Sequence, residues 1–316
     1  MKLHDALTRL SLYVDSLRST KANEFRKYTK EMFDEIKKEF ENVNYNTLDG
    51  LTKSDLNKLI VKIRRSMSKV YNKYAVALLE WLKRFMFATR KLVMQIMFYD
   101  RVKRISEDDE ELDESLANAF DRDAGEPTED EETTLFPLLM WAAVQKQKAP
   151  VNNMTIGGMI TAFTAASTYA IVKVTKDAWA NGDTVADTLD KYAAAFDKAR
   201  GQEAAVTATA TQQVYLKVKA AVMSAYYKSY IWVSILDSKT SDICLRLNGK
   251  VYRFGSGKLP PAHYRCRSHI EPYTGTQPPD ESFDEWFSKQ PKDVRNSANE
   301  ALTLDKYAKR IDLILQ

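Results

Sequence analysis

The strongest constraint on the fold is the spacing of large apolar residues near the start of the chain. They recur at intervals of three and four, at Leu3, Leu7, Leu10, Tyr13 and Leu17 and then at Phe25, Tyr28, Met32, Phe33, Ile36 and Phe40. This period places them on one helical face. The 316 residues include only 10 Gly and 9 Pro, which argues against a turn-rich all-β fold. We therefore predict a mainly α fold with long N-terminal helices.

Helical spacing continues through most of the chain. Thr52 or Ser54 is suited to cap a second helix that runs through Val70, and a third helix is expected from about 71 to 102. Further helices are expected over 149–172, 183–196, 202–232 and 282–316. Between the last two, Asn248-Gly249 predicts a turn and 251–254 a short strand. These patterns predict a helical middle region with a small irregular α+β C-terminal module.

The charge distribution suggests where the chain divides. Residues 53–104 hold 14 Lys and Arg against three acidic residues, a net charge of +11. Residues 107–132 hold 14 Asp and Glu against Arg122, a net charge of −13. Like charges repel, and the acidic run has few apolar residues to offset the entropy of ordering. We therefore predict a basic helical domain at 1–105, an acidic linker at 106–134, and a helical region at 135–316 that carries a C-terminal module with its core at 232–290.

The basic region is a candidate surface for DNA or for an acidic partner. Two groups of cations lie along its expected helices: Lys62, Arg64, Arg65, Lys69 and Lys73, and then Lys83, Arg84, Arg90 and Lys91. An ordinary solvated helix face is one interpretation. Contacts with phosphates or with an acidic protein patch are the other, because the excess of charge is larger than solubility requires.

One uncharged stretch is long enough to cross a bilayer. It runs from Ala149 to Val172, but it contains seven Asn, Ser and Thr residues and much Ala and Gly. Small residues of this kind suit close packing of helices inside a protein core, so we expect no membrane partner.

Both cysteines and two of the three histidines lie in one short segment. The order is Cys244, His263, Cys266 and His269, with eighteen, two and two residues between them. Two thiolates and two imidazoles could complete a tetrahedral zinc shell, although the spacing is not that of a standard zinc finger. The alternative is that the cysteines are small buried apolar residues and that no cofactor is present. Two cysteines form no disulfide framework, so a reducing cytoplasm is the expected place of synthesis.

The same segment resembles the core motif of the Mu protein F-like minor head proteins of tailed bacteriophages. The matching residues run in order as Asp237, Thr240, Cys244, Gly249, Pro260, Pro261, His263, Cys266 and Arg267. The family usually continues with a second cysteine after the arginine, whereas this chain has Ser268 there and His269 one residue later. If that cysteine binds a metal in relatives, His269 would have to replace it.

The resemblance implies a structural role rather than an enzymatic one. It implies a virion protein, made in the host cytoplasm and placed in the head interior near the portal vertex. The partners implied are the portal protein, with the major capsid protein and packaged DNA as further candidates. Two alternatives stay open: a metal-dependent nuclease or toxin with His263 as a base, which needs a carboxylate nearby, and a DNA-binding packaging or ejection factor.

Overall fold

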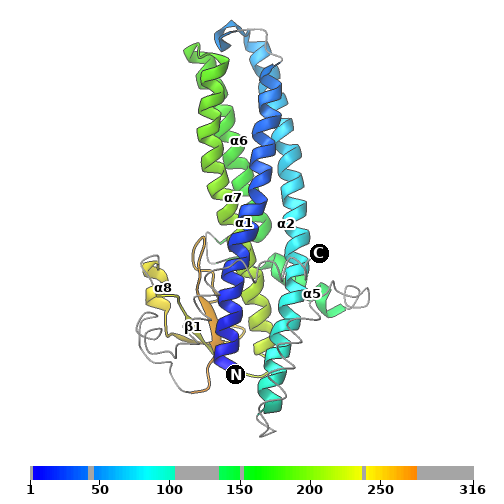
Figure 1. Ribbon diagram of the computed structural model, residues 1–316, viewed down its shortest axis with the longest axis vertical. Helices are drawn as coiled ribbons and strands as arrows, with labels where there is room; N and C mark the ends of the chain where they lie inside the picture. Colours follow the sequence, from blue (N-terminus) through cyan, green and yellow to red (C-terminus); the bar gives the residue numbers. More distant parts are fainter. Residues whose placement is uncertain (1–2, 42–45, 104–134, 150–152, 237–239, 276–316) are drawn as a thin grey trace. The chain divides into compact units, whose positions relative to one another are not determined.

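A computed structural model describes residues 3–41, 46–103, 135–149, 153–236 and 240–275 (Figure 1). Within these residues the chain is mainly helical, as predicted, with a small antiparallel sheet near its C-terminal end. The elements in chain order are α1 (Leu3–Glu41), η1 (Leu48–Gly50), α2 (Lys53–Lys103), α5 (Leu135–Lys146), α6 (Ile156–Asn181), α7 (Val185–Met223), β1 (Ser229–Val233), α8 (Asp242–Leu247), β2 (Val251–Arg253) and β3 (His269–Pro272).

The two long N-terminal helices follow from the apolar spacing, with one difference. The second and third helices that we predicted are a single helix, α2. No Gly or Pro interrupts the chain around Tyr71, and the buried face continues from Val70 through Tyr74, so nothing breaks the helix there. Its start is as predicted: Thr52 Oγ1 accepts a hydrogen bond from the Asp55 amide at 3.2 Å and caps the first turn.

The described residues form two compact units, and each combines segments from distant parts of the chain. The bundle unit comprises Lys21–Glu80 and Ile156–Ala208. Aromatic contacts pair its helices. Phe33 on α1 meets Phe196 on α7 with ring centroids 5.5 Å apart, and Tyr71 on α2 meets Phe163 on α6 at 5.3 Å. Four helical segments therefore share one core.

The sheet unit comprises the described residues that lie within Met1–Thr20, Trp81–Thr155 and Thr209–Gln316. Its sheet has the order β2-β1-β3, and β1 pairs antiparallel with both neighbours. Tyr230 lies opposite Tyr252 on β2, and Trp232 lies opposite Ile270 on β3. The first helix joins this unit through Ser11, whose hydroxyl lies 2.8 Å from the Tyr215 hydroxyl of α7.

The prediction of a helix over 202–232 is wrong in its last part. Helix α7 ends at Met223, and Ser229–Val233 is the central strand of the sheet. The strand residues are aromatic and β-branched, which suits an extended buried strand. A short apolar run fits a helix and a strand equally well. Here the segment forms a strand, because it pairs with β2 on one side and with β3 on the other. The short strand expected at 251–254 is confirmed as β2.

Two parts of the sequence prediction lie outside the described residues, namely the acidic linker at 106–134 and the C-terminal helix at 282–316. The proposed domain boundaries therefore stay predictions. Among the described helices, none combines the length and apolarity needed to cross a membrane.

Candidate functional site

The motif segment folds around one buried side chain in the centre of the sheet. Trp232 on β1 packs with Cys244 on α8 and with Cys266 in the loop before β3, and these three residues are at most 3% exposed. Half-buried apolar side chains surround them, namely Leu247, Tyr252 and Ala262. The motif therefore builds the core of the sheet unit's C-terminal part.

Ser234 links the strand to this core through a set of buried hydrogen bonds. Its hydroxyl accepts from the Trp232 indole N–H at 3.0 Å and donates to the Cys244 carbonyl at 2.9 Å. It also lies 3.0 Å from the Ser268 hydroxyl. Ser268, the residue that replaces the second cysteine expected from the resemblance, contributes a hydrogen bond to the core.

Three of the four predicted metal ligands come together. Ligand atoms of Cys244, His263 and Cys266 all lie within 4.8 Å of one another. The two sulfurs are 3.6 Å apart, and Cys244 Sγ is 3.2 Å from His263 Nε2. Short helix α8 positions Cys244, because Ser241 caps the helix by accepting from the Cys244 amide at 3.4 Å. His263 is half-buried, so the cluster reaches the surface on its side.

The cluster also shifts the acidity of its members. The hydrogen bond from the Cys244 thiol is the main reason why the pKa of Cys266 falls to about 6, against the opposing effect of burial. Backbone amides of Ala262 and Ser268 add to this stabilisation of the Cys266 thiolate. The contact with Cys244 likewise raises the pKa of His263 above its ordinary value. The contact between the two sulfurs therefore lowers the pKa of one thiol, and a thiolate is the form that binds metals.

His269, the fourth residue predicted as a ligand, is not a member of this group. It lies in β3, where its Nε2 is 3.1 Å from Glu271 Oε1. The same carboxylate oxygen accepts from the Thr8 hydroxyl of α1 at 2.8 Å. Over the two residues between Cys266 and His269, the chain passes from the loop into β3. Strand side chains point alternately to the two faces of a sheet, so His269 and Glu271, two residues apart, share one face. His269 instead belongs to a buried polar network with α1.

A buried arginine that the sequence analysis missed holds the loop at 263–268. Arg18 on α1 is 3% exposed. Its guanidinium donates to the Cys266 carbonyl and, at 3.5 Å, to the Arg265 carbonyl, and it pairs with Asp15. Arg265 has a φ of 60°, which is uncommon for a residue with a side chain, and its amide donates to Thr209 at 3.0 Å. The only sign of this role in the sequence is that the arginine lies among apolar residues that recur at helical spacing.

The remaining motif residues shape turns. Gly249 has a φ of 76°, which glycine adopts without strain, and its amide donates to the Trp232 carbonyl at 2.9 Å. Thr240 donates to the Ile235 carbonyl at 2.5 Å. Pro260 and Pro261 are buried and joined by a cis peptide bond, while Arg267 is half-buried. Asp237 lies outside the described residues.

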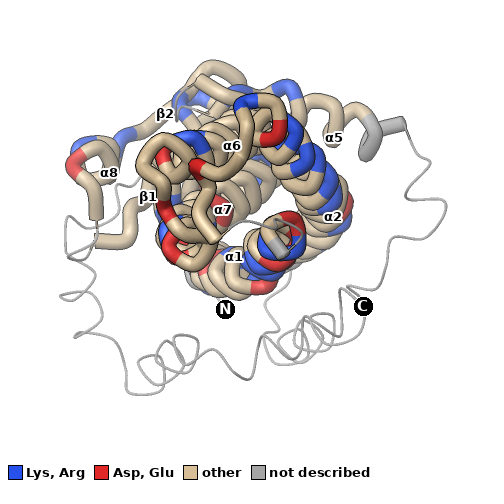
Figure 2. The backbone as a smooth tube through the Cα atoms, turned by 90° about the horizontal axis from the view of Figure 1, so that it is seen from above, with Lys and Arg blue, Asp and Glu red and all other residues tan. Residues whose placement is uncertain are grey.

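The predicted basic residues all lie on α2, which carries Lys and Arg along its length (Figure 2). Lys62, Arg64, Arg65, Lys69 and Lys73 are exposed in the bundle unit. Glu39 lies 4.0 Å from Lys62, and Glu31 pairs with Lys73. In the sheet unit Arg84 is exposed, whereas Lys83, Arg90 and Lys91 are half-buried. The structure therefore keeps only part of the predicted set available to a partner.

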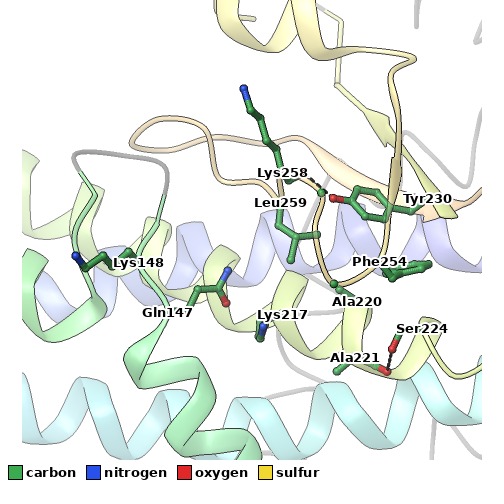
Figure 3. Close-up of a pocket in the computed structure, with 12 residues that line it drawn as sticks. Gln147, Lys148, Lys217, Ala220, Ala221, Ser224, Tyr230, Phe254, Lys258 and Leu259 are labelled. Carbon is green, nitrogen blue, oxygen red and sulfur yellow. Dashed lines mark hydrogen bonds between the residues drawn. The ribbon is translucent and has the colours of Figure 1, made fainter. Parts of the chain in front are cut away.

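A pocket of about 410 Å³ lies in the sheet unit, apart from the cysteine cluster (Figure 3). Its lining includes Lys148, Lys217 and Lys258 as well as Tyr230, whose hydroxyl donates to the Lys258 carbonyl at 2.8 Å. The Lys258 side chain extends away from the wall formed by α7 (Figure 3). The three cations therefore do not converge on one point, and no predicted site residue lines the pocket.

Replacing Gly257 with alanine is expected to destabilise the sheet unit by roughly 1–3 kcal/mol, the usual cost of overpacking. A Cβ there would lie 2.4 Å from the Tyr230 hydroxyl and 2.8 Å from the Arg253 carbonyl. The measurement is the free energy of unfolding in urea. As the matched control, Gly201→Ala on α7 meets no atom within 4 Å and should be neutral or stabilising. Equal stability of the two variants would contradict the predicted clash.

Comparison with known proteins supports the resemblance found in the motif. Residues 170–271 match the family model described as phage Mu protein F like protein. The match begins within α6 and ends in β3, so it includes the cysteine cluster and all three strands. No curated protein and no solved structure matches the chain. Over residues 170–271 the chain is therefore similar to the phage Mu protein F-like family.

Proposed function

We propose that the protein is a structural minor head protein of a tailed phage, placed in the head interior near the portal vertex. It would associate with the portal protein, with the major capsid protein as a further partner, and aid head assembly or the packaging or ejection of DNA. The observation that carries this proposal is the family match over 170–271. The use of the motif residues supports it: Trp232, Cys244 and Cys266 are buried packing partners, so the motif builds a stable module.

The C-terminal module offers apolar side chains for docking on a protein. Ile243 and Leu245 on α8 are 50% and 51% exposed, and Val251 on β2 is 40% exposed. Burying such side chains drives protein association and is insensitive to moderate salt. We propose that this set, here called the apolar docking residues, contacts the portal protein.

A second contact would be electrostatic. Arg64, Arg65 and Lys69 are exposed on α2 and, within the part of the chain that the structure describes, form no ion pair. Exposed cations of this kind bind phosphates or acidic surfaces, and such binding weakens as salt rises. We propose that they touch packaged DNA or an acidic portal surface.

The nuclease alternative gains no support from the described residues. A metal-dependent nuclease with His263 as base needs carboxylates at the metal. Among the residues that the structure describes, the group around His263 consists of Cys244 and Cys266 and includes no carboxylate. Glu271, an acidic residue close to this segment in the sequence, instead contacts His269 and Thr8.

The test is capture of the full chain by the portal protein of the same phage, at low and at moderate salt. We expect capture at both. The double substitution Ile243→Ser and Leu245→Ser should abolish capture at moderate salt, because it removes the apolar contact. The triple substitution Arg64→Gln, Arg65→Gln and Lys69→Gln should weaken capture, or binding to duplex DNA, only at low salt.

The matched control is Val76→Ser on α2, a 56% exposed valine outside the family match, which should leave capture unchanged. Absence of capture at both salt concentrations would overturn the portal association. Capture that survives the Ile243 and Leu245 substitutions would place the contact on another surface.

A further inference from the structure

We propose that Cys244, His263 and Cys266 bind one zinc ion, with water in the fourth position. The proposal concerns the internal chemistry of the module and does not depend on which partner the protein meets in the phage head. It differs from the expectation of a four-ligand site, because His269 lies in another network.

The spacing of the three ligand atoms suits tetrahedral zinc. Bonds of about 2.3 Å to sulfur and about 2.0 Å to nitrogen place two sulfurs about 3.8 Å apart, and a sulfur and a nitrogen about 3.5 Å apart. The sulfurs of Cys244 and Cys266 are 3.6 Å apart, and Cys244 Sγ lies 3.2 Å from His263 Nε2. Small shifts of these side chains would therefore bring all three ligand atoms to bonding distance from one zinc ion. A disulfide would instead need the sulfurs about 2.05 Å apart.

The ring of His263 is oriented as a ligand would be. Its Nδ1 lies 2.8 Å from the Tyr264 carbonyl oxygen, which can only accept, so Nδ1 carries the proton and donates. Nε2 is then left with its lone pair directed at the Cys244 sulfur. Metal-binding histidines almost always donate their other ring N–H to a carbonyl or carboxylate in this way.

The Cys244 sulfur is in contact with both of the other ligand atoms. It lies beside the Cys266 sulfur and beside His263 Nε2, and either sulfur can donate in the contact between them. A zinc ion would bind all three lone pairs at once.

The fold around the cluster explains what the metal would do. Cys244 comes from α8, whereas His263 and Cys266 come from the irregular loop before β3. A bound ion would cross-link these two segments and stabilise a part of the chain that has little regular structure of its own. No described carboxylate joins the group, and His263 is half-buried, so solvent reaches the fourth position.

The test uses the full chain purified from cells supplied with zinc. Elemental analysis is expected to give one zinc per chain. Cobalt substitution should produce a sulfur-to-cobalt charge-transfer band, which reports thiolate ligation directly. Removing the metal with a chelator should lower the unfolding temperature, and adding zinc should restore it.

His263→Ala is the main variant, because the side chain is half-buried and its loss should leave the fold intact. It is expected to weaken zinc binding roughly 100-fold or more, since one of three protein ligands is lost. Cys266→Ser should weaken the charge-transfer band markedly, because only the Cys244 thiolate remains. His269→Gln is the matched control and should keep one zinc per chain.

Several outcomes would overturn the proposal. One is a chain without zinc or cobalt binding in which both thiols titrate as free, because the cysteines would then be ordinary buried side chains. A second is the absence of free thiols in the unfolded chain, which would show a disulfide. A third is loss of zinc from a folded His269→Gln variant, which would restore the four-ligand site.

Discussion

Replacing Arg18 with alanine is expected to lower the free energy of unfolding of the sheet unit by roughly 3–5 kcal/mol, the usual cost of removing one partner from a buried charged network. The guanidinium donates to the carbonyls of Arg265 and Cys266 and pairs with Asp15. Its loss would leave a buried carbonyl without this donor and would release a loop that contains a left-handed residue.

The measurement is urea unfolding, combined with hydrogen exchange of the peptide that covers residues 263–268. Exchange there should accelerate in Arg18→Ala even below the unfolding transition. The matched control is Arg9→Ala, on the exposed face of the same helix, which should change the stability by no more than about 0.5 kcal/mol. Similar results for the two variants would contradict the role given to Arg18.

Stability of the bundle unit is expected to fall as the pH rises from about 5 to about 8, because of one buried carboxyl group. Glu203 on α7 is 1% exposed and accepts a hydrogen bond from Thr29 on α1. Burial raises its pKa to about 8 from an ordinary value of 4.5. Between these two values the folded state binds one more proton than the unfolded state, so the free energy of unfolding decreases with rising pH.

The Glu203→Gln variant removes this titration while keeping the shape of the side chain. It should be similar to the parent near pH 5 and more stable near pH 8.5, by an amount on the order of a few kcal/mol. Thermal unfolding across this pH range is the measurement. Glu80→Gln, an exposed position on α2, is the matched control and should leave the pH dependence unchanged. A parent-like fall of stability in Glu203→Gln would show that another group titrates.

Much of the fold could be predicted because helices are local. The intervals between Leu3 and Phe40 determine which face of α1 is buried, whatever that face packs against. The cap at Thr52 is also a local feature, since it needs only a side-chain oxygen and the amide three residues later. The division of 53–103 into two helices was wrong. Apolar periodicity indicates which face of a helix is buried, but it does not show where the helix ends, and no Gly or Pro marks an end here.

The strand at 229–233 could not be predicted from local sequence patterns. Tyr230, Ile231 and Trp232 suit a buried helix or a buried strand equally, and only the partners on β2 and β3 decide between them. The same holds for the cation set on α2. The sequence predicts the charges, whereas ion pairs such as Lys62–Glu39 depend on which helices become neighbours.

In the candidate site, the sequence by itself determined the chemical groups available, the motif order and the resemblance to a family. The residue types specify the thiol and imidazole groups, and turns such as Asn248-Gly249 depend on local backbone preferences. Only the tertiary structure decided that Cys244, His263 and Cys266 meet while His269 joins Glu271 and Thr8. The physical reason is that a ligand set is a matter of distances between segments far apart in the chain, and packing against buried groups such as Arg18 sets those distances.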